Sequence, residues 1–500
     1  MRSVTAKEMY DIDRKAINDY QLSGVLLMEN AGRAIAGKIQ AELTKDMKAV
    51  VLIGAGNNGG DGFVIARTLL NLGFQLDVIQ LVADADIKGD AAEHKAILTK
   101  FNCPIIHIDQ TSLCQKLIHS ADIIIDAMLG IGFKGRLKEP YRSVVEEVNT
   151  LETKVVAVDI PSGVPAETTN QPITAIKADL TYCIEAPKPS AFIERYASFY
   201  GKWEIVEIGL PSRLIEASSK EVWTLEKVKQ TLPRREQHSH KGSHGKGLII
   251  GGTKTMPGAA RLTANAALRS GAGLLTVATS QEALPVVASG VTEATFLDLD
   301  DEQIDLLAEI KSFDAIAIGM GMGRSDQTQL IVDTVLTSEK PVVVDADGLF
   351  YLKNHLSELK NRKAPTILTP HPGEMSMLTD QSIAQIKNNP FEIAKSFAVK
   401  HQLYLVLKGA YTIVTAPNGY QTINQTGNPA LAKGGSGDCL AGIILAQVMQ
   451  KGTIEASLAN ACYIHGLAAD LAVEKDHSMI DFLATDLINF LPKAFRTCLD

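Results

Sequence analysis

The stretch Ala49-Val50-Val51-Leu52-Ile53 is an apolar run of strand length. It leads directly into the turn Gly54-Ala55-Gly56-Asn57-Asn58-Gly59-Gly60-Asp61-Gly62. A helical pattern follows from Phe63 to Leu72. This is a G-x-G-x-x-G turn between a strand and a helix, the context in which such turns bind the pyrophosphate of a dinucleotide. The stretch therefore predicts an α/β sheet with a ligand site where this strand ends.

Three polar residues, Asn57, Asn58 and Asp61, distinguish this turn from a plain dinucleotide-binding loop. A carboxylate beside a pyrophosphate repels it, whereas amide and carboxylate oxygens can bind a hard cation that bridges to the phosphate. The alternative is structural, because Asn and Asp also form local turns and helix N-caps.

Further apolar runs alternate with helical patterns beyond this turn, at residues 76–81, 104–108, 122–125 and 155–158. This alternation predicts a parallel, doubly wound sheet. The carboxyl ends of the strands line the ligand crevice in such a sheet. We therefore expect the residues that follow three of these strands to converge, namely Asn58, Asp126, Asp159 and Ser162. A second glycine-rich loop, Gly130–Arg136, lies in the same part of the chain.

The stretch Ala432–Gly442 is another glycine-rich turn, and the apolar run Leu440–Val448 continues it at helical spacing. A turn of this kind points several N–H groups and the positive end of a helix dipole at one place, which suits a phosphate. Asp438 lies at its mouth. An acid kept beside a phosphate site suggests a base that activates an incoming hydroxyl. The alternative is that a glycine ends one helix and Asp438 caps the next.

The second half of the chain repeats the strand–helix rhythm, with strands predicted at 247–251, 273–277, 315–318, 342–344, 366–369 and 403–407. The last of these leads into Lys408-Gly409-Ala410-Tyr411-Thr412, a turn that can present a cation and N–H groups to a nucleotide phosphate. A hairpin turn with a solvated lysine is the alternative. The segment Pro211–Gln237 lacks this rhythm and is the predicted domain boundary. The histidines of residues 238–244 are interpreted as a polar entry loop because no nearby acid or cysteine completes a metal site.

Composition limits the functions of the chain. It has 500 residues, of which 46% are hydrophobic and 21% charged, so it is expected to fold rather than be disordered. A net charge of -8 argues against a nucleic-acid partner. The six scattered cysteines form no C-x-x-C pair, which favours reduced thiols and a cytoplasmic location. The N-terminus lacks a secretory pattern and Leu440–Met449 is too short to span a bilayer, so no membrane association is expected.

The first half resembles a known family. Leu27-Met28-Glu29-Asn30-Ala31-Gly32, Gly56–Gly62 and Asp159-Ile160-Pro161-Ser162-Gly163 are similar to motifs of the NAD(P)H-hydrate epimerases. The resemblance implies that Asp159 contacts the substrate as a proton shuttle. It implies a potassium ion held by Asn58, Asp126 and Ser162. The residues implied to bind the hydrated dinucleotide are Asn57, Asn58, Gly59, Gly60, Asp61, Gly130, Ile131, Gly132, Phe133, Lys134, Gly135, Arg136 and Asp159.

The second half resembles a different family. Lys408-Gly409-Ala410 and Gly434–Asp438 are similar to motifs of the ribokinase-like fold. Thr369-Pro370-His371-Pro372-Gly373-Glu374 and Gly258-Ala259-Ala260-Arg261 narrow the resemblance to ADP/ATP-dependent NAD(P)H-hydrate dehydratases. The resemblance implies that Lys408, Gly409, Ala410, Tyr411, Thr412 and Gly437 bind ADP. It also implies that Ala259, Gly321, His371 and Asp438 bind the hydrate, with Asp438 as the base.

Together the resemblances imply a Rossmann-like epimerase domain over residues 1–218 and a ribokinase-like dehydratase domain over residues 225–500. Such a chain epimerises the R and S hydrates of NADH and NADPH (NADHX and NADPHX) and dehydrates the S-hydrate. ADP is the phosphoryl donor and Mg²⁺ and K⁺ are the cofactors. We expect a homo-oligomer. Two rival functions remain, a ribokinase-like small-molecule kinase fused to a dinucleotide-binding domain, and a nucleotide sensor without catalysis.

Overall fold

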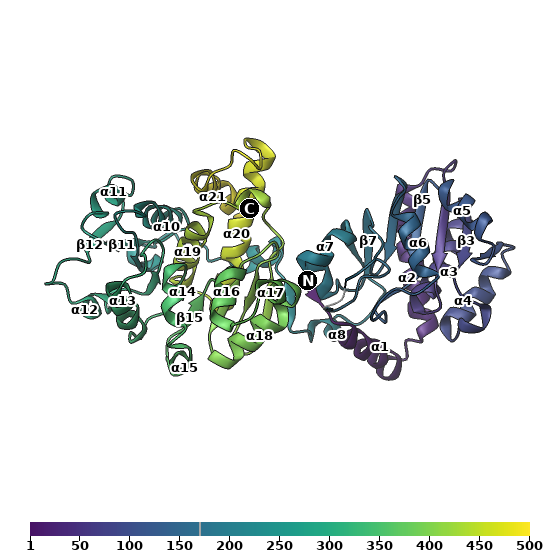
Figure 1. Ribbon diagram of the computed structural model, residues 1–500, viewed down its shortest axis with the longest axis horizontal. Coiled ribbons are helices and arrows are strands. Elements are labelled where there is room, and N and C mark those ends of the chain that lie inside the picture. The colour runs from purple at the N-terminus through teal and green to yellow at the C-terminus, as the bar shows by residue number, and fades with distance from the viewer. Residues whose placement is uncertain (170–171) are drawn as a thin grey trace. The chain divides into compact units, whose positions relative to one another are not determined.

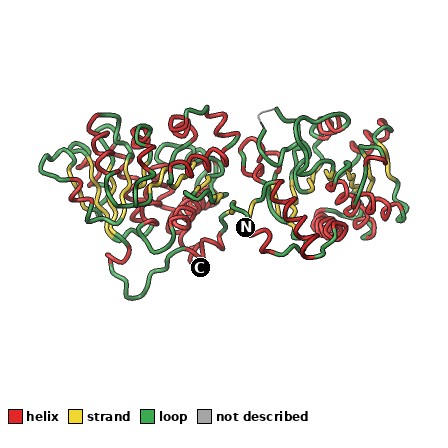
Figure 2. The backbone as a smooth tube through the Cα atoms, turned by 90° about the horizontal axis from the view of Figure 1, so that it is seen from below, coloured by secondary structure: helices red, strands yellow, loops and turns green. Residues whose placement is uncertain are grey.

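The computed structural model describes residues 1–169 and 172–500, and the chain divides into two compact units, Met1–Ser218 and Ser219–Asp500. Within each unit the strands lie at the centre and helices surround them (Figures 1 and 2). No helix in the described part of the chain has the length and apolar character needed to span a bilayer.

The first unit is built on a sheet of seven parallel strands in the order β4-β3-β2-β5-β6-β7-β8. Its strands are β2 (Lys48–Ile53), β3 (Gln75–Gln80), β4 (Ile105–His107), β5 (Ile123–Ala127), β6 (Lys154–Val158), β7 (Leu180–Ile184) and β8 (Lys202–Val206). The other elements are β1 (Arg2–Ser3), α1 (Ala6–Tyr20), α2 (Gly24–Ile39), α3 (Asn57–Asn71), α4 (Asp90–Thr99), α5 (Thr111–His119), α6 (Tyr141–Val148), α7 (Glu194–Tyr200) and α8 (Ser212–Glu216).

The winding of this sheet reverses at β2, which pairs with β3 on one side and with β5 on the other. From β2 the chain first runs outward through β3 and β4, and it then returns to start the other half at β5. This order is that of a Rossmann-type sheet, whose ligands bind at the carboxyl ends of the strands beside the reversal. The predicted doubly wound sheet is confirmed, and it places the turn after β2 next to the loop after β5.

The helix after the first glycine-rich turn begins earlier than its sequence predicts. We expected it at Phe63, but α3 begins at Asn57, so Asp61 lies inside the helix. Close packing explains this start: a Cβ at Gly59 would lie 2.1 Å from the carbonyl oxygen of Gly54, and one at Gly60 would lie 2.3 Å from the sulfur of Met28. These glycines let the helix approach its neighbours, and that packing overrides their poor helix propensity.

The second unit contains a mixed sheet in the order β9-β18-β17-β16-β15-β14-β13-β10-β11-β12. Pairing is parallel except between β16 and β17 and between β17 and β18. Its strands are β9 (Lys220–Val222), β10 (Lys246–Ile250), β11 (Leu274–Thr279), β12 (Thr295–Asp298), β13 (Ala315–Ile318), β14 (Val342–Val344), β15 (Thr366–Leu368), β16 (Tyr404–Leu407), β17 (Ile413–Thr415) and β18 (Gln421–Ile423).

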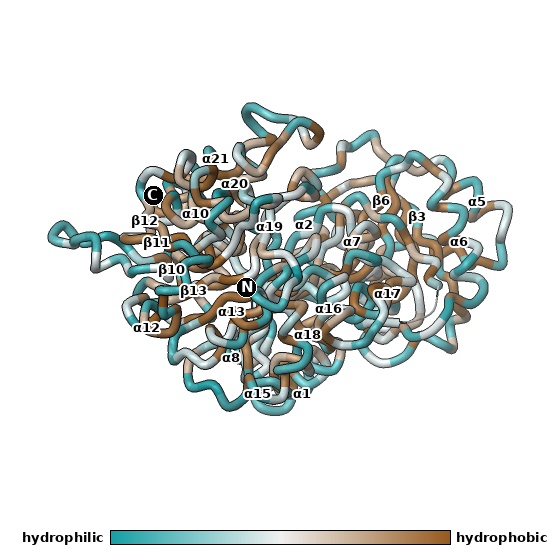
Figure 3. Tube along the Cα trace, turned by 60° about the vertical axis from the view of Figure 1, so that its left-hand side comes forward, coloured by the Kyte–Doolittle hydropathy of each residue, from teal (hydrophilic) through white to brown (hydrophobic). Residues whose placement is uncertain are grey.

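Alternate residues along a strand point to opposite faces of this sheet and pack into two separate hydrophobic cores. Ala315 and Ala317 of β13 pack into one core, whereas Ile316 and Ile318 pack into the other. Figure 3 shows β13, like β6 of the first unit, in the brown of hydrophobic residues. The helices of the unit are α9 (Leu225–Thr231), α10 (Pro257–Arg269), α11 (Leu284–Ala288), α12 (Leu306–Ile310), α13 (Asp326–Leu336), α14 (Asp347–Leu352), α15 (Leu356–Leu359), α16 (Pro372–Thr379), α17 (Ile383–Asn388), α18 (Pro390–His401), α19 (Ser436–Val448), α20 (Ile454–Lys475) and α21 (Ala484–Leu499).

The helix after the second glycine-rich turn, α19, also begins earlier than predicted, at Ser436 rather than Leu440. Gly435 is its N-cap and has φ +94°, a left-handed conformation that favours glycine. A Cβ on Gly442 would lie 2.1 Å from the carbonyl oxygen of Thr263, so α19 packs closely on α10 (Figure 1).

All six cysteines are buried and unpaired: Cys103, Cys114, Cys183, Cys439, Cys462 and Cys498. Burial raises the pKa of every one of these thiols, to about 12 for Cys183 and Cys462. The thiols are therefore packing groups rather than nucleophiles or metal ligands.

Candidate active sites

The first unit has a cavity of about 490 Å³ at the carboxyl ends of β2, β5 and β6. This is the crevice that the strand order predicts. Helices α1 and α2 contribute an apolar wall, including Met9, Ile17 and Leu27. Several predicted substrate-binding residues line the cavity: Asn57, Asn58, Asp61, Gly130, Ile131, Gly132, Phe133 and Asp159.

Other predicted residues lie elsewhere. Gly59 and Gly60 are buried in the packing of α3 and do not line the cavity. Lys134 is exposed, and Gly135 and Arg136 line a smaller hollow of about 230 Å³ that shares Phe133 with the cavity. The loop Gly130–Arg136 therefore faces two adjoining spaces.

The three residues predicted to hold potassium converge. Ser162 donates hydrogen bonds to Asp126 from its backbone N–H (2.7 Å) and from Oγ (2.6 Å). Asn58 Nδ2 donates to the carbonyl oxygen of Leu129 (2.8 Å), while Leu129 N–H donates to Ser162 Oγ (2.8 Å). Burial raises the pKa of Asp126 to about 6. Asn58 is therefore connected to Asp126 through the backbone of Leu129 and the side chain of Ser162.

One oxygen in this group is unsatisfied. Asn58 Oδ1 is buried, and within the described residues it accepts no hydrogen bond. A buried acceptor without a donor is costly, and a cation removes that cost. Amide, carboxylate and hydroxyl oxygens suit a potassium ion, so the residues present fit the predicted group.

Asp159 has a strained backbone and a fixed side chain. Its φ is +65°, which is uncommon for a residue other than glycine and is typical of functional positions. Oδ1 accepts hydrogen bonds from Lys188 Nζ (2.6 Å) and from the backbone N–H of Ile184 (3.0 Å). Lys188 is only 1% exposed and lines the cavity. Sequence reasoning missed Lys188, because nothing in the segment after β7 marks it.

Two other groups of this cavity come from α1 and were also missed. Burial, with Asp159 and Glu185 as like charges, raises the pKa of Asp13 to about 6 despite the nearby Lys188. Burial and the charges of Asp13 and Asp159 also raise the pKa of Tyr10. Their approach to Asp159 spans about 150 residues of sequence, so no local pattern could have predicted it.

In the second unit, Asp438 occupies the first turn of α19 but does not cap it. The N-cap is Gly435, and among the described residues no backbone N–H donates to the Asp438 carboxylate. The alternative interpretation of Asp438 as a helix cap is therefore wrong. Burial raises the pKa of Asp438 to about 7, with Asp345 adding to the rise and Lys408 opposing it. A pKa near the working pH suits a general base.

Lys408 lies in the loop between the antiparallel strands β16 and β17, so the predicted hairpin is present. Its ammonium is paired rather than free, because Nζ lies 2.9 Å from Asp345 Oδ1 and 3.8 Å from Glu374 Oε2. Burial opposes the charge, but the two carboxylates outweigh it and raise the pKa of Lys408. A Cβ on Gly437 would lie 3.4 Å from the same Nζ, which places Lys408 against the first turn of α19.

Of the residues predicted to bind the hydrate, His371 is connected to this cluster through Glu374, and Gly321 packs against Ala259. His371 caps α16: its Nδ1 accepts from the N–H groups of Gly373 (2.9 Å) and Glu374 (3.2 Å), which leaves the ring proton on Nε2. Gly321 has φ +63°, and a Cβ there would lie 2.8 Å from that of Ala259. Glu374 links His371 to Lys408, and sequence reasoning gave it no role.

Residues 409–412 of the predicted ADP site form a loop that is partly exposed to solvent. Gly409 and Ala410 are exposed, and Tyr411 and Thr412 are half-buried. Burial raises the pKa of Tyr411. The loop joins β16 to β17 and begins at Lys408, so it lies beside the glycine-rich turn.

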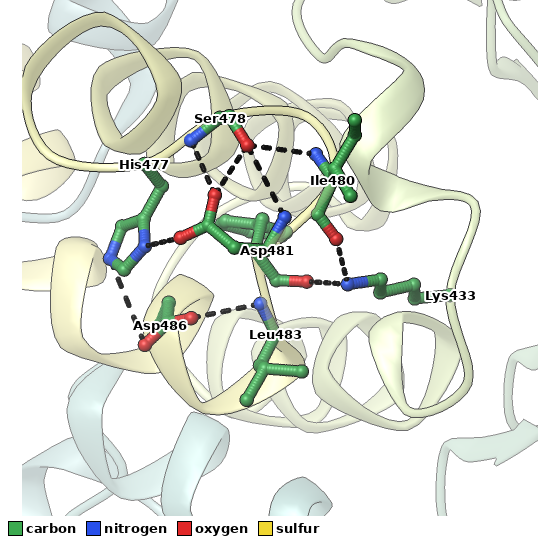
Figure 4. A network of polar contacts seen from close by, with 8 residues as sticks. Lys433, His477, Ser478, Ile480, Asp481, Leu483 and Asp486 are labelled. Carbon is green, nitrogen blue, oxygen red and sulfur yellow. Dashed lines mark hydrogen bonds and ion pairs between the residues drawn. The ribbon is translucent and has the colours of Figure 1, made fainter.

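Two side chains hold the glycine-rich turn in place. Lys433 Nζ donates to the carbonyl oxygens of Ile480 and Phe482, both at 2.6 Å, and Figure 4 shows this clamp on the segment before α21. His465 of α20 is half-buried, and its Nε2 lies 3.0 Å from the carbonyl oxygen of Ser436. Burial lowers the pKa of His465 to about 4, so it is neutral. Neither residue was singled out from the sequence.

The polar loop of residues 238–244 forms one turn of 3-10 helix over Lys241–His244. His240 caps it, with Nδ1 accepting from the N–H of Gly242 at 3.1 Å. Burial lowers the pKa of His244.

Comparisons with known proteins show which proteins the chain is similar to. The family model of NAD(P)H-hydrate dehydratases matches residues 247–493, and that of the YjeF-related protein N-terminus matches residues 25–190. The bifunctional NAD(P)H-hydrate repair enzyme of Moorella thermoacetica is 36% identical over an alignment of 514 positions. The alignment covers 99% of this chain and 97% of that protein. The Escherichia coli enzyme of the same description is 33% identical over 96% of this chain and 91% of its own.

The chain belongs to the bifunctional NAD(P)H-hydrate repair enzyme family.

Solved structures agree with this family for the second unit. The ADP/ATP-dependent NAD(P)H-hydrate dehydratase of Bacillus subtilis, co-crystallised with ATP and Mg²⁺, is 37% identical with a TM-score of 0.51. The match covers 56% of this chain and 98% of that one. A ribokinase-like superfamily protein of Enterococcus faecalis matches with 26% identity and a TM-score of 0.51, over 57% of this chain and 98% of its own. The predicted ribokinase-like fold is confirmed.

Proposed function

We propose that this chain repairs hydrated NAD(P)H in two steps. Water added across a ring double bond of NADH or NADPH gives R and S hydrates that no longer donate hydride. The unit formed by residues 1–218 interconverts the two hydrates. The unit that contains residues 225–500 dehydrates the S-hydrate at the expense of ADP. Membership of the repair-enzyme family and the presence of one acid-bearing site in each unit support the proposal.

Asp438 is the observation that carries the dehydration step. It lies in the first turn of α19, next to Gly437 and the half-buried Lys408, and its pKa is raised to about 7. Asp438 accepts the proton of the substrate hydroxyl as that oxygen takes a phosphoryl group from ADP. The N–H groups of the Gly434–Gly437 turn stabilise the charge that develops on the phosphoryl oxygens. Phosphate then leaves with the C–O electron pair, the neighbouring ring carbon loses a proton to solvent, and the ring double bond returns.

The ADP site in this proposal is Lys408, Gly409, Ala410, Tyr411, Thr412 and Gly437, and the hydrate site is Ala259, Gly321, His371 and Asp438. Lys408 has a second task, because it holds Asp345 and Glu374 beside Asp438. Magnesium bound with the nucleotide neutralises phosphate charge.

Potassium belongs to the first unit in this proposal. Asn58, Asp126 and Ser162 hold it, and the unsatisfied Oδ1 of Asn58 supports the assignment. The ion supplies positive charge next to the substrate phosphates when it is bound. Asp159 contacts the substrate near its reacting carbon and acts as a proton shuttle. We further propose that the chain acts in the cytoplasm as a homo-oligomer, without nucleic-acid or membrane partners.

One assay tests the function. The protein is incubated with mixed R and S hydrates plus ADP or ATP, and recovery of the reduced-nicotinamide absorbance is followed. We expect full recovery with a nucleotide, because epimerisation feeds the R-hydrate into dehydration. A small-molecule kinase would instead leave a stable phosphorylated product, and a sensor would leave both hydrates unchanged.

A further inference from the structure

The cavity of the first unit contains a second carboxyl group that has no partner. Asp61 of α3 is only 7% exposed and lines the cavity together with Asp159. Among the described residues nothing donates a hydrogen bond or an ion pair to its carboxyl group. A buried carboxylate without a donor is costly, so Asp61 favours its neutral, protonated form. Burial, with Asp159 and Asp13 as like charges, raises its pKa well above the usual range.

Asp159 lies in the opposite environment. Its Oδ1 is held by the Lys188 ammonium at 2.6 Å and by the N–H of Ile184 at 3.0 Å. An ammonium at this distance stabilises the ionised carboxylate. Lys188 itself is held by the carbonyl oxygens of Ala186 (3.0 Å) and Ile184 (3.3 Å), so it cannot swing away. Oδ2 of Asp159 accepts no hydrogen bond within the described residues, and it is the oxygen available to a proton.

One cavity thus contains a buried carboxyl group without a donor and another whose Oδ1 is held by an ammonium and a backbone N–H. Two acids whose environments differ in this way are the arrangement of an acid–base pair. We propose that Asp61 is the general acid and Asp159 the general base of epimerisation, with Lys188 as the residue that positions Asp159. This inference rests on the epimerase function proposed above and adds a division of roles to it.

The reaction balances with these two groups and solvent water. The hydroxyl-bearing carbon of the hydrate is next to the ring nitrogen. Asp61 gives its proton to the hydroxyl, the C–O bond breaks, and the nitrogen lone pair forms a C=N⁺ bond as water leaves. A water molecule then adds to the other face of that carbon and loses a proton to Asp159. The carbon is inverted and one proton has moved from Asp61 to Asp159. Proton exchange with solvent water then reprotonates Asp61 and deprotonates Asp159 before the next turnover.

Substitution of Asp61 tests the proposal in the full chain. Asp61→Asn keeps the shape of the side chain but cannot donate an acidic proton. We expect kcat for conversion of pure R-hydrate to S-hydrate, followed by chromatography without nucleotide, to fall about 10²- to 10⁴-fold. KM should change only a few-fold. The matched control is Asp19→Asn, an exposed position at the end of α1, which should keep the wild-type rate.

Folding of the variants is checked separately. The second unit should dehydrate the S-hydrate at the wild-type rate in every variant, and thermal unfolding should show an intact first unit. Asp61→Ser, a smaller neutral residue, repeats the test if Asp61→Asn unfolds. An unchanged kcat in either variant overturns the proposal, as does a loss in Asp13→Asn that Asp61→Asn does not share. A wild-type chain that does not interconvert the hydrates would overturn the epimerase function itself.

The pH profile separates positioning from mere structure. The titratable groups facing the pair are Tyr10, Asp13, Asp61, Asp90, Asp159, Glu185 and Lys188. We expect kcat/KM to fall at high pH as Asp61 ionises, and this limb should vanish in Asp61→Asn. Lys188→Met should lower kcat far more than it changes KM, because Oδ1 of Asp159 loses the ammonium that holds it, and Lys188→Arg should restore kcat in part. Profiles that do not differ overturn the assignment of roles.

An oxygen label tests the bond that breaks. In water enriched in ¹⁸O, inversion through C–O cleavage places one solvent oxygen in each S-hydrate formed. Retention of the original oxygen during inversion would overturn the proposed step.

Discussion

Lys408 Nζ lies 2.9 Å from Asp345 Oδ1, and this ion pair between a half-buried lysine and a buried aspartate lies beside Asp438. Asp345 raises the pKa of Asp438 and Lys408 lowers it. The two partners of one ion pair therefore push the proposed base in opposite directions. Their separate removal should move its titration in opposite directions as well.

The first prediction concerns this titration. Asp438 is protonated below its pKa of about 7, so the dehydration rate should rise with pH up to about 7 and then level off. Lys408→Met should move this limb to higher pH, and Asp345→Asn should move it to lower pH, each by about one unit. The pH dependence of single-turnover dehydration at saturating ADP measures both shifts. Equal positions in all three proteins would contradict the assignment of Asp438.

The second prediction concerns Asp438 itself. Asn cannot take a proton at neutral pH, so Asp438→Asn should lose about 10²- to 10⁴-fold in dehydration. ADP binding, measured by calorimetry, should survive or tighten because a like charge is removed. Epimerisation should be unchanged. Asp326→Asn is the matched control, because Asp326 also lies in the first turn of a helix, α13, and is exposed. Normal dehydration by Asp438→Asn would mean that Asp438 is not the base.

The third prediction concerns potassium. Asp126→Ala removes a carboxylate and frees Ser162 from two hydrogen bonds, so it should abolish the dependence of epimerisation on potassium and lower its rate. In the wild-type chain, potassium should raise the melting temperature of the first unit more than lithium does, because the ion satisfies Asn58 Oδ1. Calorimetric scans in the two salts measure this. Activity and melting that do not differ between them would refute the site.

The fourth prediction concerns the boundary of the second unit. Strand β9 pairs with β18, and Trp223 is 7% exposed with its ring N–H donating to Asn460 at 2.9 Å. A fragment of residues 219–500 should fold and dehydrate the S-hydrate. A fragment of residues 225–500 lacks β9 and Trp223, and it should be less stable by about 3–5 kcal/mol. Urea unfolding of the two fragments compares them, and equal midpoints would show that β9 is dispensable.

The sequence predicted the sheets and the loops that carry the sites, because strands buried on both faces read as apolar runs and the polar residues directly follow them. Asn58, Asp126, Asp159 and Asp438 were predicted in this way as candidate site residues. The helix starts at Asn57 and Ser436 were missed. Glycine and asparagine have poor helix propensity, and only close packing explains why they are helical there.

The charged partners of the sites were harder to predict. Lys188, Asp13 and Glu374 carry no local signal, and their roles depend on contacts between distant segments. Asp345 offered a usable signal, because it directly follows β14 as Asp159 follows β6. Lys408 was expected at a phosphate or in solvent. The sequence could not show that the carboxylates of Asp345 and Glu374 lie against its ammonium.

The six buried thiols allow the folding of each half to be followed through the protein's own cysteines. Cys103, Cys114 and Cys183 belong to the first unit, and Cys439, Cys462 and Cys498 belong to the second. Because burial and a raised pKa protect them all, an alkylating reagent modifies a thiol only after its surroundings open. Brief alkylation under rising denaturant, read by mass spectrometry, would therefore record the opening of either half by its own three cysteines. The alkylation of these cysteines therefore shows whether the two cores open independently.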